Sequence, residues 1–302
     1  VEHYVTAFQF QGGGGAFGSI TPLPGVPSSV EKGGDWTLQR LVRETSPVQR
    51  DALFAFGAAA AAPQAEVLMS AEFDALDITV LKGGADEVGA WATAHGFRLP
   101  PDAPEVLEFY AARSPIFLAA AFDADAAKAR GQSIGDGTSV HVTIPTPNPW
   151  VPLRILGLGK QATDQVQADV YLLTDRQPAL LPATGDGSGL ALDYNQAASD
   201  GLLSDLRSDR GMGWVPSTGW LSKITIDTQA ATLKFDLAID ARGQGAPSRV
   251  QAGLDRPGSI SPDGSLAAAF LFGMFAAGAV LVVVLGARGR PGWFGQRPTA
   301  AA

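Results

Sequence analysis

Cysteine is absent from the chain of 302 residues, and histidine is scarce, with three residues. Without cysteine the chain has no disulfide, no thiolate-bound metal and no cysteine nucleophile. An exported domain of this composition must be held together by packing alone. The histidines His3, His95 and His141 lack the H-x-H or H-x-x-x-H spacing of a zinc site. We expect His95 and His141 to be structural, with His95 compensating the dipole at the C-terminus of a helix and His141 on the face of a strand opposite Val140.

Positive charge is also in short supply. The chain has 22 Lys and Arg residues against 30 Asp and Glu residues, which gives a formal net charge of −8. Nucleic acid and anionic lipid headgroups repel an acidic chain. We therefore expect no nucleic acid among the binding partners, and no docking on anionic headgroups.

Charged, amide, hydroxyl and proline residues are all missing from the run Leu266–Ala287. A helix rises about 1.5 Å per residue, so this run reaches roughly 33 Å and can cross a hydrocarbon layer of roughly 30 Å. Lipid offers the backbone no hydrogen-bond partners, and a helix satisfies its own amides there. The sequence predicts a single transmembrane helix over residues 266–287; a wholly buried soluble helix is the alternative.

The flanks of this run predict its orientation. Three arginines follow it, Arg288, Arg290 and Arg297, and none of the residues after it is acidic. Positive charge resists translocation, so residues 288–302 should form a cytoplasmic tail and everything before the run should be extracytoplasmic, at the cell membrane. Export of so large a domain implies a signal peptide, which is not present. Because the chain opens at Val1, we expect a processed or truncated sequence, or a non-standard start codon rendered as Val.

The residues before the run have short, mixed patterns. Alternating or continuous apolar stretches predict strands, and helical spacings between them predict a few short helices. We expect an α+β fold with mixed, largely antiparallel sheets over residues 1–240, as one domain or two subdomains. Residues 241–265 are rich in Gly, Pro and Ser without periodicity, which predicts a stalk. The main predicted strands are Tyr4–Phe10, two pieces within Glu66–Leu81, Ile116–Phe122, Val140–Ile144 and Val170–Leu173.

Helix ends are signalled by polar residues and glycine. Asp35 is a predicted N-cap, and Asp102 with Glu105 forms a D-x-x-E variant of the capping box. After His95, Gly96 is a predicted left-handed cap with Phe97 packing back on the last turn. The clearest strand signal is the period-two run of Ile224 to Ile239, which predicts a hairpin that turns at Thr228–Thr232.

The middle of the chain resembles a known family. Segments 76–122, 135–155 and 168–182 look like the bacterial domain-of-unknown-function family 2330 in the order of their motifs. The resemblance covers roughly Phe8 to Asp240 and implies an exported, envelope-associated protein. Members often have a cysteine-containing start after the signal peptide, which this chain lacks, and the family has no established activity. The features that carry the resemblance fall on Val80 and Leu81, Trp91 to Phe97, Tyr110, Phe117 to Ala119, and Pro152 to Arg154.

No catalytic set stands out in the sequence. Ser188 and Thr138 lie in the strings GDGSG and GDGTS, without the strand-to-helix context of a nucleophile elbow. Asp136 and Asp186 in these strings offer oxygen ligands to Ca²⁺, but Asp-Gly is also the ordinary chemistry of a tight turn. We therefore predict turns, and we expect no catalytic residue, no metal site and no cofactor.

Partner contacts are predicted in two places. Ala269, Gly273 and Ala277 form a small-x-x-x-small stripe on one face of the predicted span, which lets another helix approach closely. Trp150, in the proline-rich string PTPNPWVP, and Trp214 and Trp220, in the loop GMGWVPSTGW, are the predicted exterior contacts.

These observations predict a non-enzymatic, single-pass protein of the cell envelope. Its extracytoplasmic domain should bind or stabilise a partner, as an accessory subunit of a larger membrane assembly such as a respiratory complex. The predicted partners are the lipid bilayer and other membrane-protein subunits. The alternative is an exported, membrane-tethered enzyme or a Ca²⁺-dependent cell-wall-binding module.

A charge in the small-residue stripe tests the predicted helix contact. Because a Gly273→Arg side chain prevents close approach of a second helix, the variant should lose any membrane protein that co-purifies with the chain after gentle detergent extraction. Unchanged recovery of the complex would remove the stripe from the contact.

Overall fold

The computed structural model describes residues 1–9, 16–45, 65–131, 137–185, 187–243 and 245–257. Within these ranges the chain has the predicted α+β fold, with antiparallel sheets and short helices. None of the helices in these ranges is long and apolar enough to cross a membrane. The predicted span over residues 266–287 and the tail that follows it lie outside the described residues.

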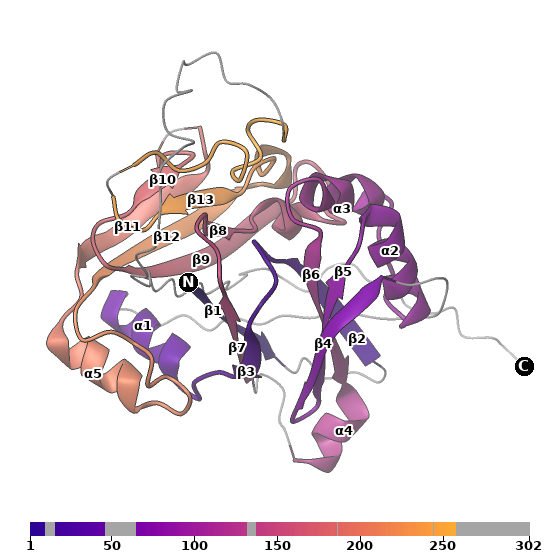
Figure 1. Cartoon of the computed structure of the whole chain (residues 1–302), viewed down its shortest axis with the longest axis horizontal. Helices are drawn as coiled ribbons and strands as arrows, with labels where there is room; N and C mark the ends of the chain where they lie inside the picture. The colour runs from indigo at the N-terminus through magenta and orange to yellow at the C-terminus, as the bar shows by residue number, and fades with distance from the viewer. Residues whose placement is uncertain (10–15, 46–64, 132–136, 186, 244, 258–302) are drawn as a thin grey trace, which may run out of the picture.

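Two antiparallel sheets come from the first half of the chain (Figure 1). One has the order β1-β7-β3 and the other the order β2-β6-β5-β4. The predicted strands in this half are confirmed, including the pair within Glu66–Leu81. The bounds are β1 Glu2–Gln9, β2 Ala16–Pro22, β3 Ser29–Lys32, β4 Glu66–Phe73, β5 Leu76–Lys82, β6 Ile116–Asp123 and β7 Gly137–Ile144.

Two further antiparallel sheets come from the second half. Their strand orders are β11-β12-β9 and β10-β13-β8. The bounds are β8 Trp150–Val151, β9 Gln165–Thr174, β10 Ala179–Leu181, β11 Leu190–Ala197, β12 Trp220–Gln229 and β13 Leu237–Asp240. The predicted hairpin over residues 224–239 is wrong: β12 pairs with β9 and β11, whereas β13 pairs with β8 and β10. Residues 224 to 229 of β12 alternate as predicted, whereas in β13 Leu237, Ala238 and Ile239 are all buried. The 3-10 turn Ala230–Thr232 lies between the two strands, which join different sheets.

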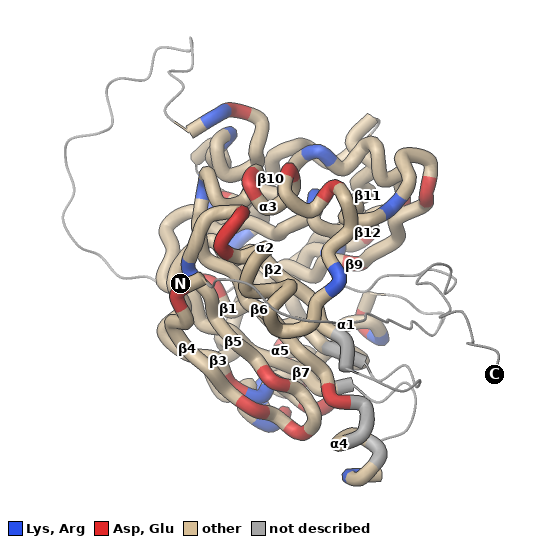
Figure 2. The backbone as a smooth tube through the Cα atoms, turned by 90° about the vertical axis from the view of Figure 1, so that its right-hand side faces the viewer, with Lys and Arg blue, Asp and Glu red and all other residues tan. Residues whose placement is uncertain are grey.

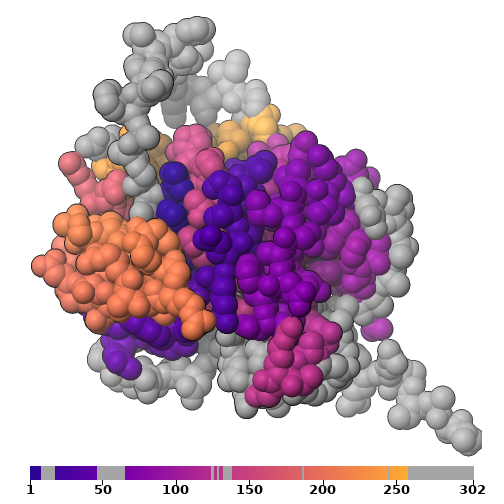
Figure 3. All heavy atoms as spheres, turned by 60° about the horizontal axis from the view of Figure 1, so that its bottom comes forward, coloured from indigo at the N-terminus to yellow at the C-terminus, as the bar shows by residue number. Residues whose placement is uncertain are grey.

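The apolar faces of the sheets meet in one central core, and helix pairs cover two outer faces. The core combines residues of strands from both halves, among them Val80, Leu118, Val142, Val170 and Ile224. Helices α2 and α3 pack on the outer face of the β2-β6-β5-β4 sheet (Figure 2), and α1 and α5 pack beside β9 and β12. The helices are α1 Thr37–Thr45, α2 Ala85–Ala94, α3 Ala103–Ala111, α4 Ala124–Ala129 and α5 Asp200–Ser208. Seen from below, β3 and β4 come together at the surface (Figure 3).

A buried carboxylate joins the two halves of the chain. Asp236 lies just before β13 and is fully buried, as is its ion-pair partner Arg113, whose Nη2 lies 2.6 Å from Asp236 Oδ2. The other oxygen accepts hydrogen bonds from the Tyr110 hydroxyl at 2.8 Å and from the Leu153 amide at 2.8 Å. The amide of Arg154 adds a further bond at 3.1 Å. Four donors therefore hold one anion inside the fold, which is the condition under which a buried ion pair is tolerated.

Trp150 belongs to this buried centre. Its side chain is 0% exposed, and its ring stacks on Tyr110 with centroids 5.7 Å apart. The Arg113 guanidinium lies 5.1 Å from the Trp150 ring centroid. The proline-rich string that precedes Trp150 was expected to present it to a partner, but strand β8 turns it into the core. Because the fold encloses this ring, we leave Trp150 out of the contact surface.

The predicted stalk begins later than residue 241. The amide of Asp236 donates to the Ala252 carbonyl at 2.9 Å, and Arg113 Nη1 donates to the Gln251 carbonyl at 2.5 Å. Ala252 is fully buried. Gln251 and Ala252 therefore pack on the domain, although their segment lacks periodicity, because their backbone carbonyls make the contacts. Arg256 and Pro257 are exposed.

Two predicted helix caps are replaced by contacts from distant residues. The start of α1 is capped by Asp209, whose carboxylate accepts from the Asp35 amide at 3.0 Å, the Trp36 amide at 3.0 Å and the Thr37 hydroxyl at 2.7 Å. Burial opposes ionisation of Asp209, but these hydrogen bonds outweigh it and lower the pKa of the carboxyl. The Asp35 side chain is therefore not the cap.

The capping box predicted at α3 is also wrong. Asp102 has the N-cap position but makes no side-chain cap, and its carboxylate instead accepts from the Gly159 amide at 3.1 Å. Glu105 is drawn into an ion pair with Arg154. A reciprocal bond of the capping-box kind occurs at α2, where Glu87 accepts from the Gly84 amide at 2.8 Å.

Removing the cation beside Asp236 should be costly. Arg113→Met leaves the carboxylate buried without its counter-charge, and we expect the domain to lose about 3–5 kcal/mol of unfolding free energy, measured by urea denaturation. Lys82→Met is the control, because it breaks the exposed pair with Glu66, which should cost at most about 1 kcal/mol. Equal losses in the two variants would contradict a central role for the Asp236 pair.

Candidate functional site

The outer face of the β2-β6-β5-β4 sheet is only partly covered by helices. Helices α2 and α3 pack on its upper end through Leu81 and Phe117. Beyond that end, the register aligns Ser70, Thr79 and Ala119 in one row across β4, β5 and β6. These side chains are small, so they leave space above the sheet where larger ones would fill it.

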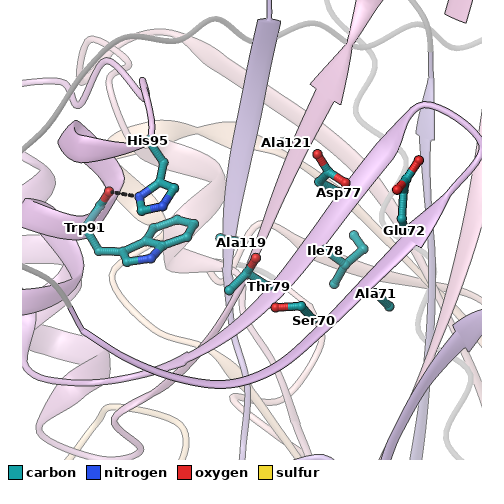
Figure 4. A pocket seen from close by; sticks show the side chains of 10 residues that line it. All are labelled: Ser70, Ala71, Glu72, Asp77, Ile78, Thr79, Trp91, His95, Ala119 and Ala121. Atoms are coloured by element: carbon teal, nitrogen blue, oxygen red, sulfur yellow. Dashed lines mark hydrogen bonds between the residues drawn. The ribbon is translucent and has the colours of Figure 1, made fainter. Parts of the chain in front are cut away.

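A hollow of about 570 Å³ occupies this space (Figure 4). It is open to solvent on one side, and its lining combines three strands with the C-terminal end of α2. The picture shows Trp91 and His95 on one side of the hollow and the carboxylates of Glu72 and Asp77 on the other. The remaining lining residues are Ser70, Ala71, Ile78, Thr79, Ala119 and Ala121.

The aromatic wall of the hollow is a stacked pair. The rings of Trp91 and His95 lie 4.0 Å apart at 15°, and His95 Nδ1 is 2.9 Å from the Trp91 carbonyl oxygen. Since a carbonyl only accepts, Nδ1 must donate, and Nε2 of the neutral ring is an acceptor. Trp91 is buried whereas His95 is exposed, so the imidazole is the ring that a bound group can touch.

The local sequence explains why His95 stands there. As predicted, His95 closes α2, and Gly96 follows with φ of +92°. The amide of Phe97 then returns to the Ala92 carbonyl at 2.8 Å, and its ring packs against the sheet. At this contact the sheet has Gly18, where an added Cβ would lie 2.2 Å from the Phe97 ring. This close approach positions the end of α2, and with it the aromatic wall.

The opposite end of the hollow is acidic. Glu72 and Asp77 are direct cross-strand neighbours on β4 and β5, and acidic positions gather at the lower end of these strands in Figure 2. Burial, then the charges of Glu72 and Asp123, raise the pKa of Asp77, while Arg130 opposes the rise. Arg130 Nη2 lies 3.5 Å from Glu72 in an exposed pair. Like charges directly opposite each other destabilise a sheet, so this arrangement carries a cost that the fold does not require.

The hollow therefore offers mainly hydrogen-bond acceptors. The carboxylates and His95 Nε2 accept, while the hydroxyls of Ser70 and Thr79 do both. Across the described ranges of the chain, no three His, Asp or Glu side chains are grouped so as to hold a metal ion. The arrangement suits a group that donates several hydrogen bonds and has positive charge.

The tryptophans predicted as contacts lie elsewhere. Trp214 is half-buried and stacks on His3 at 4.1 Å and on His141 at 4.7 Å. Trp220, at the start of β12, is also half-buried and donates from its indole nitrogen to Asn195 Oδ1 at 2.6 Å. These two residues and the buried Trp150 contact different sets of neighbours. Ala269, Gly273 and Ala277 lie outside the described residues.

His3 and His141 form a pair beneath Trp214. His3 Nδ1 lies 2.9 Å from His141 Nε2, on neighbouring strands β1 and β7. Burial lowers the pKa of each imidazole to about 4. Both rings are therefore neutral at physiological pH and stack on Trp214, which agrees with the structural role expected for His141.

The described part of the Asp-Gly string, Gly185 and residues 187–189, agrees with the predicted turn. The Gly185 amide donates to the Leu190 carbonyl at 2.8 Å, and the Ser188 hydroxyl donates to the Gly185 carbonyl at 2.9 Å. The two aspartates considered for Ca²⁺, Asp136 and Asp186, lie outside the described residues.

Sequence reasoning did not find the hollow. It identified Trp91 and His95 only as parts of a helix end, and it did not single out Glu72 or Asp77. The available signal was the alternation in β5, where the polar residues Asp77 and Thr79 share one face of the strand. That signal could not reveal which strand lies opposite.

Comparison with known proteins gives one match. A family model described as an uncharacterized protein conserved in bacteria (DUF2330) matches residues 3–214. No curated protein and no solved structure matches the chain. The matched residues include every residue that lines the hollow.

Neutralising one carboxylate should stabilise the domain. Because the pKa of Asp77 is raised in the folded state, this group favours folding below its folded pKa and opposes it as the pH rises through that value. We therefore expect Asp77→Asn to raise the unfolding free energy at pH 7 by about 0.2–1 kcal/mol, the size of a cross-strand pair term. Urea denaturation at pH 7 and pH 4 checks this, and the gain should shrink at pH 4. A variant less stable than the parent at pH 7 would show that Asp77 contributes to the fold.

Proposed function

The chain belongs to the bacterial family DUF2330, and from this premise we propose that it is a non-enzymatic, single-pass protein of the cell envelope. Its extracytoplasmic domain binds a partner at the hollow, as an accessory subunit of a larger membrane assembly. The observation that carries the proposal is the pair Glu72 and Asp77, which face each other across two strands beside an open hollow. A fold that retains this repulsion gains from a partner that neutralises it.

The membrane attachment is supported by the sequence and by the end of the folded domain. The described chain contacts the domain at Gln251 and Ala252 and continues to Pro257, and the predicted span begins at Leu266. The residues between them reach at most roughly 30 Å when fully extended. A tether of this length keeps the domain close to the bilayer, with the segment 248–257 on the side nearest to it.

The remaining contacts extend the same proposal. The stripe of Ala269, Gly273 and Ala277 associates with a helix of another subunit, and the half-buried Trp214 and Trp220 supply additional apolar surface to the assembly. The hollow has three exposed polar residues, Glu72, Asp77 and His95, that belong to none of the apolar clusters of the described residues. The hollow therefore provides the specific contact with the partner, while the predicted span holds the chain at the membrane.

Filling the hollow tests this function. Thr79→Arg places a long cationic side chain on the floor between the aromatic wall and the carboxylates. After gentle detergent extraction from native membranes, the parent chain should bring a partner with it, and the variant should lose most of that partner while staying in the membrane fraction.

The control is Leu192→Arg, which introduces the same side chain at an exposed position of strand β11. It should retain the partner. Recovery of the chain in the soluble fraction would contradict the membrane attachment, and equal partner recovery in both variants would contradict binding at the hollow.

A further inference from the structure

Strand β4 is an open edge of the sheet that carries the hollow. The order β2-β6-β5-β4 gives it one neighbour, β5, and no strand pairs with its other side among the residues that the structure describes. Strand β3 approaches it without pairing, and Lys32 reaches across to Asp74 at 2.8 Å. Val67 on β4 is 49% exposed. An exposed edge presents unpaired N–H and C=O groups that can accept another strand.

The same strand forms one side of the hollow. Ser70 and Glu72 of β4 line it, and both lie on the face that β5 continues with Thr79 and Asp77. A strand added beside β4 would lie about 4.8 Å further out, and its alternate side chains would stand in the same rows on the same face. Each such side chain would therefore meet Ser70 or Glu72 first and then Thr79 or Asp77.

The chemistry of these rows selects the added side chain. The row of Glu72 and Asp77 presents two carboxylates. Asp123 adds negative charge to the row, and Arg130, which pairs with Glu72 at 3.5 Å in an exposed contact, offsets part of it. Beyond the row of Ser70 and Thr79 stands the exposed ring of His95, whose Nδ1 bonds to the Trp91 carbonyl and leaves Nε2 as the other nitrogen of the ring. A long cationic side chain donates to these acceptors, whereas an acidic one would be repelled.

We propose that the edge of β4 accepts an extended, basic segment of a partner protein as an additional strand. The backbone of the segment pairs with β4, and its alternate lysine or arginine side chains enter the hollow and donate to Glu72 and Asp77. This inference rests on the function proposed above and names the partner's chemistry. Main-chain pairing supplies affinity, and the hollow supplies specificity for positive charge.

Peptide binding to the full chain tests the proposal. The chain is placed in nanodiscs of zwitterionic lipid, which do not attract cationic peptides, and the probe is a fluorescent ten-residue peptide of alternating Lys and Thr. We expect saturable binding by fluorescence polarisation that weakens with salt. A peptide of alternating Glu and Thr should not bind. Equal binding of the two peptides, or binding of neither, would overturn the proposal.

Variants separate the two parts of the contact. The double variant Glu72→Gln with Asp77→Asn should weaken binding of the Lys-Thr peptide about tenfold at low ionic strength and reduce its salt dependence. The double variant Glu108→Gln with Asp175→Asn, which makes an equal change of charge at two exposed positions outside the hollow, should leave it unchanged. Identical affinities for the double variant and the parent chain would exclude the hollow as the cation site.

Backbone pairing is tested on the peptide. Two versions are made, one N-methylated at every Lys and the other at every Thr. Because only alternate residues of an added strand direct their N–H groups to β4, one version should lose binding and the other should largely retain it. Retention by both would show that no strand is added.

The outcomes also distinguish this inference from the proposed function. If Thr79→Arg loses the membrane partner but the Lys-Thr peptide does not bind, the hollow binds a partner of other chemistry, and only the present inference fails. If the peptide binds but no partner is recovered from membranes, the function fails. If the chain is dimeric and binds the peptide only after dissociation, the β4 edge belongs to a second copy, and the inference is overturned.

Discussion

The fold depends on the ion pair between Arg113 and Asp236, which are separated by more than a hundred residues and fully buried together. Around it, Tyr110 and the backbone of Leu153 satisfy the carboxylate, and Trp150 stacks on Tyr110. With no cysteine available, this charge-centred cluster does what a disulfide does in many exported domains: it ties distant segments together. The difference is that a buried ion pair stabilises the fold only while every donor around it stays in place.

This cluster also decides where the binding surface can be. It locks α3 to the second half of the chain, and α2 follows because the two helices pack together on one end of the sheet. Their position leaves the rows of Ser70 and Glu72 uncovered. The carboxylate of Asp236 is buried and has four hydrogen-bond donors, whereas Glu72 and Asp77 are like charges that face each other at the surface. The domain thus combines a strongly satisfied buried anion with exposed anions that a partner can satisfy.

Where sequence reasoning failed, the reason is competition from distant groups. Asp35 and Asp102 both stand at helix starts and have the right chemistry for capping. However, the carboxylate of Asp209, which is distant in the chain, accepts from the amide of Asp35 at the start of the first helix. The carboxylate of Asp102 accepts from the Gly159 amide instead of capping its own helix. The alternation of Ile224 to Ile239 correctly indicated two strands, but not that they join different sheets. Proline neighbours suggested that Trp150 is exposed, and its ring instead fills the space beside Tyr110.

The sequence by itself determined the α+β class, most strands, the helix end at His95 and Gly96, and the family. Periodicity, caps and motif order are local properties of the chain, so they can be recognised before the neighbours in space are known. Only the tertiary structure decided which strands pair, which carboxylate caps which helix, and that Glu72, Asp77, Thr79 and His95 surround one hollow. These side chains come from strands and helices that are far apart in the chain. They meet only when the strands pair in one particular register. The register depends on the summed burial of many apolar residues, and no short stretch of sequence contains all of these residues.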